Sequence, residues 1–228
     1  MAEKDPKTVT DAANGTVESK ENEIIEAAAA RQKYVFWGMI AIAAVAFVVI
    51  LYVFAIRQPG IKAGNEAIGQ PDYNMLVGND SIALAQYTQV ANTYSYDAGN
   101  RAALMAAIMN FQKGDYQQAL DMVKKYKAQD KIVGAAAASL EGDCNVNLKQ
   151  YDAAIKCYDK AISISDNNPE YTPLFLMKKA TVQREIKDYA GEVKTLEAVK
   201  KYPKYWSQYQ IDIDKYLARA QREAELAK

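Results

Sequence analysis

Histidine is missing from the 228 residues of the chain, and only two cysteines are present. Without histidine there is no imidazole to shuttle protons at neutral pH, no serine–histidine or cysteine–histidine dyad, and no histidine-built metal site. Two cysteines are too few for a four-thiolate zinc or iron–sulfur site. We also find no phosphate-binding loop, nucleophile elbow or pair of carboxylates in a sequence context that would support catalysis. The sequence therefore predicts a protein that is not an enzyme and that holds no cofactor or metal.

Charge of one sign is not in excess, because 28 lysines and arginines balance 28 aspartates and glutamates. A protein that binds nucleic acid needs a basic surface to neutralise phosphates. The balanced charge gives no reason to expect such a surface. We therefore predict no nucleic-acid partner, and no small-molecule substrate is evident from the motifs.

One long apolar run stands out from an otherwise ordinary composition. Residues 34–56 contain no charged side chain, and a helix of this length reaches about 34 Å, enough to cross a hydrocarbon core of about 30 Å. Tyr34 and Trp37 near one end and Tyr52 near the other match the aromatic belts of membrane helices. A buried core helix is usually shorter, and a cleaved signal peptide has a shorter, basic leader. The run therefore predicts one uncleaved transmembrane helix.

The segments on either side of the run suggest the topology. Residues 1–33 are polar and are predicted to be a largely disordered cytoplasmic tail. Three lysines or arginines lie within 20 residues before the run and two after it, a small margin that favours a cytoplasmic N-terminus. The sequence Arg57-Gln-Pro-Gly60 predicts a helix break. Residues 57–79 are then a linker, and residues 80–228 form the C-terminal domain.

Three segments of the C-terminal domain repeat one pattern, a turn followed by a tyrosine and an alanine-marked helix. The tyrosines Tyr116, Tyr151 and Tyr189 are 35 and 38 residues apart. A period near 34 residues predicts an all-α solenoid of tetratricopeptide (TPR) hairpins. The repeats span about 100–133, 135–168 and 173–206. A helix over about 208–226 would cap the solenoid, because a terminal repeat otherwise exposes an apolar face.

Small residues are expected to face large ones where the two helices of a hairpin pack. In the middle repeat, Gly142 stands where the first helix approaches the second, which carries Tyr158. The third repeat departs from this pattern, because Glu192 replaces the small residue of its second helix. The residues predicted to pack within the hairpins are Ala107, Gly114, Tyr116, Ala119, Gly142, Tyr151, Ala154, Tyr158, Ala161, Ala180 and Tyr189.

In a TPR solenoid the first helices of the hairpins line a groove that receives a polypeptide partner. Half of the predicted lining is apolar, which suits an extended or amphipathic apolar segment. The alternative is that a helix over residues 82–94 covers the first part of the groove. The predicted groove residues are Arg101, Leu104, Ile108, Phe111, Ser139, Asp143, Val146, Leu174, Met177, Thr181 and Arg184.

A clamp for the C-terminal carboxylate of a chaperone would need lysine and asparagine where Leu104, Ile108 and Leu140 stand. Only Lys178 matches, so a cytosol-facing chaperone receptor is disfavoured. Cys144 and Cys157 lie on the two helices of one repeat. A disulfide needs Cα atoms within about 7 Å, which the sequence leaves open, and both residues also fit as small buried hydrophobes.

The full layout resembles a bacterial family with a short cytoplasmic tail, one span and three to four TPR repeats on the outer side of the inner membrane. The segments that carry the resemblance are 140–151, 171–176, 201–203 and 213–220. The best-known members are ancillary TPR subunits of the Sec translocon. The resemblance implies a periplasmic domain whose partners are the translocon, secretory clients or a periplasmic chaperone. We therefore predict a membrane-anchored adaptor; the alternative is a structural subunit of an envelope assembly without a client peptide.

Overall fold

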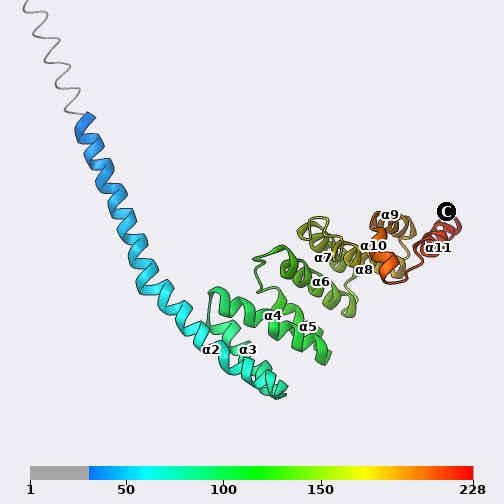
Figure 1. Cartoon of the computed structure of the whole chain (residues 1–228), viewed down its shortest axis with the longest axis horizontal. Helices are drawn as coiled ribbons and strands as arrows, with labels where there is room; N and C mark the ends of the chain where they lie inside the picture. Colours follow the sequence, from blue (N-terminus) through cyan, green and yellow to red (C-terminus); the bar gives the residue numbers. More distant parts are fainter. Residues whose placement is uncertain (1–30, 228) are drawn as a thin grey trace, which may run out of the picture. The chain divides into compact units, whose positions relative to one another are not determined.

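The computed structural model of the protein describes residues 31–227, which divide into two units (Figure 1). The first unit ends at Pro59 and the second begins at Gly60. Every regular element of the described residues is a helix, which confirms the predicted all-α fold. The tail predicted over residues 1–33 lies outside the described residues, apart from its last three.

The described part of the first unit is helical and has an exposed apolar surface. Residues 31–52 are α-helical, and all their side chains are exposed. An 18-residue window of this helix has a mean hydropathy of 3.0 and none of it is buried. Phe54 exposes 70% of its surface and Tyr34 79%. Such a helix is long and apolar enough to cross a membrane.

The helix break predicted at residues 57–60 is wrong. A π-helical turn, η1 (Val53–Arg57), leads directly into α2 (Gln58–Leu76). The amide of Gln58 donates to the carbonyl of Val53, one residue further back than in an α-helix. A proline ring clashes with the carbonyl four residues earlier in a regular helix, and the wider turn accommodates Pro59. Most of the residues predicted as the linker 57–79 are therefore helical.

The second unit is an array of helices joined mostly by short turns. Gly114 ends α4 in the left-handed conformation, with φ 84°, which glycine adopts without strain. Asp130, Asp188 and Asp212 accept hydrogen bonds from backbone amides at the starts of α6, α9 and α11. After α2, the helices are α3 (Asp80–Thr93), α4 (Tyr96–Lys113), α5 (Tyr116–Val123), α6 (Lys131–Asn147), α7 (Tyr151–Ile164), α8 (Thr172–Glu185), α9 (Tyr189–Lys200), α10 (Pro203–Gln208) and α11 (Ile213–Leu226).

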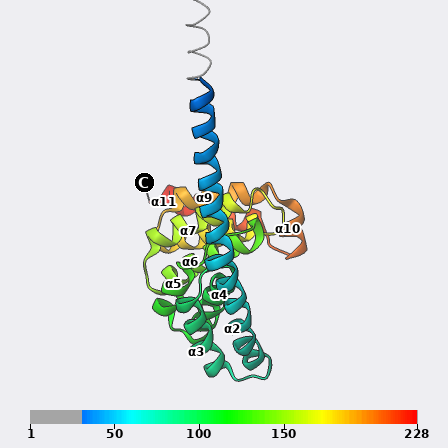
Figure 2. The same ribbon diagram turned by 90° about the vertical axis from the view of Figure 1, so that its left-hand side faces the viewer.

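The helix pairs α4–α5, α6–α7 and α8–α9 correspond to the three predicted repeats, although α4 and α6 each begin four residues before the predicted bounds. Two further features differ from the prediction. The unpredicted helix α2 precedes α3, which corresponds to the helix expected over 82–94, and Figure 2 shows α2 beside α3 and α4. The capping helix begins at Ile213 instead of residue 208, because the short helix α10 and a turn with Gln210 at φ 52° come first.

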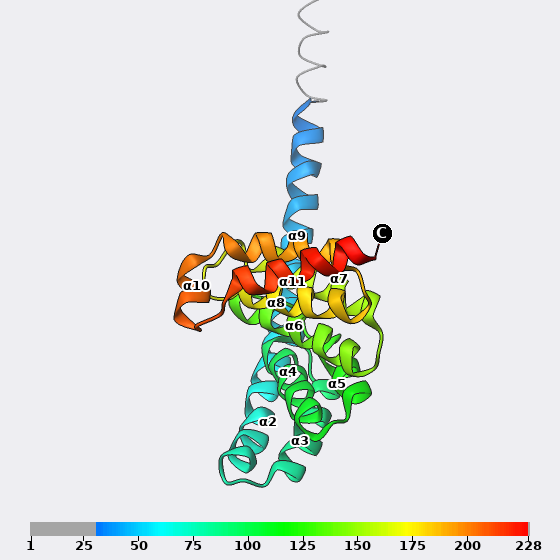
Figure 3. The same ribbon diagram turned by 90° about the vertical axis from the view of Figure 1, so that its right-hand side faces the viewer.

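The core is a series of apolar clusters, several of them shared by three helices. The clusters join α2 with α3 and α4, then α4 with α5 and α6, then α6 with α7 and α8, and finally α8 with α9 and α11. Figure 3 shows α11 lying along α8 and α9. Because each helix packs mainly on its neighbours, α11 covers the apolar face that α8 and α9 would otherwise expose.

The packing within the hairpins depends on small residues. A Cβ atom on Gly142 would lie 2.6 Å from the ring of Tyr158, which is 2% exposed. Among the other residues expected to pack, Gly114 is exposed at its turn and the three repeat tyrosines are half-buried. The buried ones are Ala107, Ala119, Ala154, Ala161 and Ala180.

Candidate functional site

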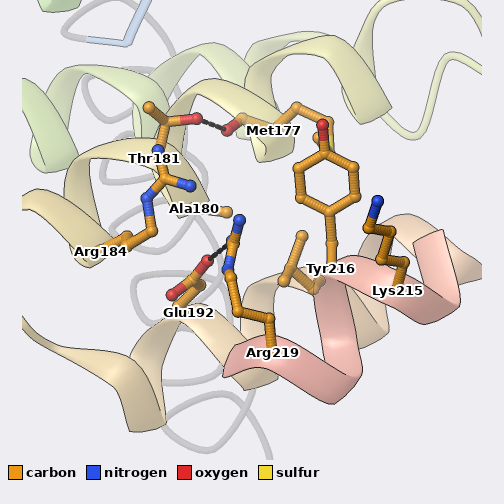
Figure 4. A pocket seen from close by; sticks show the side chains of 9 residues that line it. Met177, Ala180, Thr181, Arg184, Glu192, Lys215, Tyr216 and Arg219 are labelled. Carbon is orange, nitrogen blue, oxygen red and sulfur yellow. Dashed lines mark hydrogen bonds and ion pairs between the residues drawn. The ribbon is translucent and has the colours of Figure 1, made fainter. Parts of the chain in front are cut away.

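A pocket of about 540 Å³ lies between α8, α9 and α11 (Figure 4). Helical spacing places the α8 side chains on one face, at positions i, i+3, i+4 and i+7, and those of α11 at i, i+1 and i+4. The lining residues are Met177, Ala180, Thr181 and Arg184 from α8, Glu192 and Leu196 from α9, and Lys215, Tyr216 and Arg219 from α11.

The apolar part of the lining belongs to the core that holds the three helices together. Ala180 and Leu196 are 2% and 1% exposed, and both pack in the cluster that contains Ile213 and Leu217 of α11. Met177 is half-buried at the edge of that cluster. The apolar lining is therefore fixed by the docking of α11.

A buried ion pair forms one wall. Glu192 is 2% exposed, and its Oε1 atom accepts a hydrogen bond of 2.7 Å from Nη2 of Arg219. Burial raises the pKa of the Glu192 carboxyl, while the hydrogen bond and the charge of Arg219 act in the opposite direction. The guanidinium also lies over the ring of Tyr216, 5.2 Å from its centroid. Glu192, which breaks the repeat pattern, is thus matched by an arginine of the capping helix.

Some polar atoms in this wall and next to it lack hydrogen-bond partners. Within residues 31–227, Oε2 of Glu192, Nε of Arg219 and Oε2 of Glu223 are buried without a hydrogen-bond partner. Unpaired buried polar atoms cost stability. The pair therefore stabilises the fold less than a fully bonded one would.

Two further cations line the pocket without an ion pair. Figure 4 shows Arg184 and Lys215 at opposite ends of the pocket, from α8 and α11. Both residues are exposed. No described carboxylate lies within 4 Å of either charged group. The pocket thus combines an apolar lining with two cations that form no ion pair in the described part of the chain, although the charge of Arg184 still acts to lower the pKa of Glu192.

A polar network occupies the middle of the predicted lining. Nζ of Lys178 lies 2.6 Å from Oδ2 of Asp143 and donates to Oγ of Ser139 at 3.1 Å. The hydroxyl of Tyr158 donates to Oδ1 of Asp143 at 2.7 Å. Burial and the Asp143 carboxylate raise the pKa of Tyr158, which keeps it protonated. Ser139 is buried, so two predicted groove residues serve the contact between α6 and α8.

Residues in the first part of the predicted groove also make contacts within the fold. Nη2 of Arg101 lies 2.9 Å from Oδ1 of Asp72 in α2. Leu104 and Phe111 are half-buried against the cluster that α4 shares with α5 and α6. The helix expected over 82–94 corresponds to α3, which packs on another set of α4 residues that includes Ala102. The covering of Leu104 and Phe111 therefore comes from α5 and α6.

The predicted groove residues are thus separated into several environments. Met177, Thr181 and Arg184 come together in the pocket. Val146 is half-buried in a cluster with Tyr158, Ile108 is half-buried, and Leu174 is 38% exposed.

The contribution of α11 to the pocket was missed. The sequence pattern indicates only a capping role for this helix, so Lys215, Tyr216 and Arg219 are not among the predicted site residues. One signal pointed to it, since an acidic Glu192 in a small-residue position needs a cationic partner once buried.

The two cysteines are free thiols, with Cys144 buried and Cys157 half-buried. Burial raises the pKa of Cys144 to about 12 and that of Cys157 to about 11. The described residues also contain no group of three or more histidine, cysteine, aspartate or glutamate side chains suited to a metal ion. What the lining of the pocket itself offers is apolar surface and cations.

We expect the thiols to react slowly in the folded protein. Because the thiolate is the nucleophile, a pKa raised from 9 to about 11 lowers the reactive fraction of Cys157 at pH 8 roughly 100-fold. Ellman's reagent should label the full chain at least that much more slowly in buffer than in 8 M urea. The Cys157→Ser variant should retain one unreactive thiol. Rapid labelling of either thiol in the folded chain would contradict the burial seen here.

No family model matches the chain, and no curated protein matches its sequence. Solved structures do share its fold. A crystal structure of MamA is 18% identical over 69% of this chain and 95% of that one, with a TM-score of 0.51. A second MamA structure is 16% identical over 71% and 92% of the two chains, with a TM-score of 0.53. A putative kinesin light chain with TPR-like repeats from Podosopora anserina is 12% identical over 71% and 86%, with a TM-score of 0.54.

These likenesses, together with the helix pairs and their period, define the class. The second unit has a tetratricopeptide-type fold, as the sequence predicted. At such low identity the likeness concerns the fold alone.

Proposed function

We propose that the protein is a non-enzymatic adaptor that is anchored in a membrane and binds polypeptide partners through its TPR unit. The observation that carries this proposal is the pocket between α8, α9 and α11, which offers apolar surface and two unpaired cations. Side chains arranged in this way can hold a peptide but supply no nucleophile with an adjacent base. TPR folds specify an architecture strongly and a partner poorly.

The proposed anchor is the exposed apolar helix of residues 34–56. Its hydropathy and the exposure of all its side chains up to Tyr52 support insertion into a lipid bilayer. We place the N-terminus in the cytoplasm and the TPR unit at the outer face of a bacterial inner membrane. The charge margin and the sequence resemblance to the translocon-associated family support this orientation. The proposed partners are secreted or envelope proteins at the Sec translocon, or a periplasmic chaperone.

Membrane fractionation tests the anchor. We expect the full chain to remain in the membrane pellet after alkaline carbonate extraction, because the 13 Val, Ile, Leu and Phe residues of 34–56 favour insertion by roughly 4–8 kcal/mol. In intact spheroplasts, protease added outside should degrade the TPR unit, whereas in inside-out vesicles the unit should be protected. Recovery of the chain in the soluble fraction would refute the anchor. Protection in spheroplasts with cleavage in inside-out vesicles would reverse the topology.

Site-specific photocrosslinking tests the adaptor role in the full chain. A photoreactive residue at Met177, in the pocket, or at Leu174, a predicted groove residue that is 38% exposed on α8, should capture arrested nascent secretory chains. Lys156, exposed on α7 and outside the pocket, is the matched control position. Capture of several different secretory chains supports an adaptor. Self-crosslinks or a single fixed partner would instead support the structural subunit of an envelope assembly.

A further inference from the structure

We propose that the pocket between α8, α9 and α11 binds an extended peptide segment in which an apolar residue is flanked by two acidic residues, in the pattern acidic–x–apolar–x–acidic. This inference rests on the proposed adaptor function and names the chemistry of its ligand.

The charge of the lining points to an acidic partner. Glu192 and Arg219 neutralise each other at 2.7 Å. Arg184 and Lys215 then leave the lining with a net charge of +2, whereas the lysines and arginines of the whole chain, these two included, only equal its acidic residues. Neither cation has a carboxylate within 4 Å in the described part of the chain. A ligand carboxylate therefore gains an ion pair without displacing an existing one.

The apolar lining calls for an apolar side chain between the two acids. Met177, Ala180 and Leu196 present aliphatic surface to the cavity. A volume of about 540 Å³ is within the range of about 300–1,000 Å³ that small-ligand and peptide side-chain pockets occupy. It holds one large aliphatic residue with its neighbouring backbone. The ring of Tyr216, 37% exposed, supplies a further flat surface for that residue.

The two cations at opposite ends of the pocket favour an acid on each side of the apolar residue. Side chains of an extended segment alternate between two faces, so residues i, i+2 and i+4 share one face over about 13 Å. Arg184 and Lys215 lie at the two ends of the pocket with the aliphatic residues between them (Figure 4). Acids at i and i+4 can then face one cation each while the residue at i+2 enters the cavity. A single acidic residue would leave one cation without a partner.

Binding of a designed peptide to the full chain in nonionic detergent tests the inference. The probe is a C-amidated heptapeptide, Ser-Glu-Ser-Leu-Ser-Glu-Ser, whose N-terminal amine carries the fluorophore, and binding is measured by anisotropy. Arg184→Glu and Lys215→Glu should each weaken binding by about 5-fold or more, and together by about 20-fold or more, since each change replaces an attraction by a repulsion. Raising the salt from 50 to 300 mM should weaken binding to the unchanged protein.

Several controls make the result decisive. Lys156→Glu makes the same charge change on exposed α7 and should leave the affinity unchanged. Replacing the peptide leucine by serine should weaken binding, and a peptide with lysines in place of both glutamates should bind only the double variant. The inference would be overturned if the acidic peptide did not bind the unchanged chain. It would also be overturned if Arg184→Glu and Lys215→Glu left the affinity for the peptide unchanged. Secretory chains still captured at Leu174, which is exposed and outside the pocket lining, would in that case leave the adaptor function standing, so the two failures are distinguishable.

Discussion

Replacing Gly142 by alanine is expected to destabilise the TPR unit by about 2 kcal/mol, although alanine is the better helix former. The added Cβ would lie 2.6 Å from Cε1 and 2.9 Å from Cδ1 of Tyr158. The ring cannot easily move aside, because it is 2% exposed and its hydroxyl donates to Asp143 at 2.7 Å. Thermal unfolding of the full chain, followed by circular dichroism at 222 nm, should show a melting temperature lower by roughly 4–8 °C.

Gly69 provides the matched control for this substitution. It is also helical, in α2, but a Cβ there would meet nothing within 4 Å. Gly69→Ala should therefore be neutral or stabilise by up to about 1 kcal/mol through the lower chain entropy of the unfolded state. In a double-mutant cycle, Tyr158→Leu should make Gly142→Ala less costly by at least about 1 kcal/mol. Equal effects of alanine at positions 142 and 69 would show that the close approach of α6 to α7 does not limit the size of the side chain at position 142.

The hairpins could be predicted from the sequence because their signals are local and repeated. Each second helix starts with a tyrosine and carries its small-residue position three residues later, at Ala119, Ala154 or Glu192. All three of these residues are buried. Turn residues such as Gly114 separate the helices. The positions of the turns therefore agree with the period of the repeats. Helix type and order follow from such patterns without knowledge of distant contacts.

The helix over 58–76 could not be predicted because local and tertiary effects conflict there. Pro59 and Gly60 read as a break, yet the π-helical turn before them accommodates the proline. Packing then holds the helix, because Gly64 is buried against Ala98 and Ile68 is 7% exposed in the cluster with α3 and α4. A tertiary contact of this kind overrides a weak local preference.

The predicted groove residues are divided between several environments for a similar reason. Helical periodicity places Ser139 and Asp143 on one face of α6, but it gives no information on which side chain of α8 will reach them. Lys178 does so, and it closes the centre of the expected lining. The pocket depends likewise on where α11 docks on α8 and α9, which is a register between helices far apart in sequence. Glu192 alone hinted at that register, by requiring a cation nearby.

Replacing Arg219 by methionine is expected to cost about 2–3 kcal/mol of stability at pH 7.5, because it leaves the charge of Glu192 buried without its partner. The loss should shrink as the pH falls towards 5. Burial already raises the pKa of Glu192, and removing Arg219 removes the leading effect that opposes this shift. A carboxyl with a raised folded-state pKa binds its proton more tightly in the folded than in the unfolded chain. Its stabilising contribution is therefore present below the unfolded pKa and is lost as the pH rises through the folded one. Urea unfolding of the full chain at several pH values measures the difference from the unchanged protein.

The decisive control restores the pattern of the other two repeats. Glu192→Ala in the Arg219→Met background puts at position 192 the residue type that Ala119 and Ala154 supply in α5 and α7, and removes the buried charge altogether. This double variant should recover most of the stability lost at pH 7.5. The difference between its free energy of unfolding and that of the unchanged protein should no longer increase steeply above pH 5. Arg222→Met, at an exposed position of α11 outside the pocket lining, should change stability by less than about 0.5 kcal/mol. If Arg219→Met and Arg222→Met behaved alike at every pH, the Glu192–Arg219 pair would not anchor the capping helix. The pocket would then owe its shape to the apolar contacts of Leu196, Ile213 and Leu217 alone.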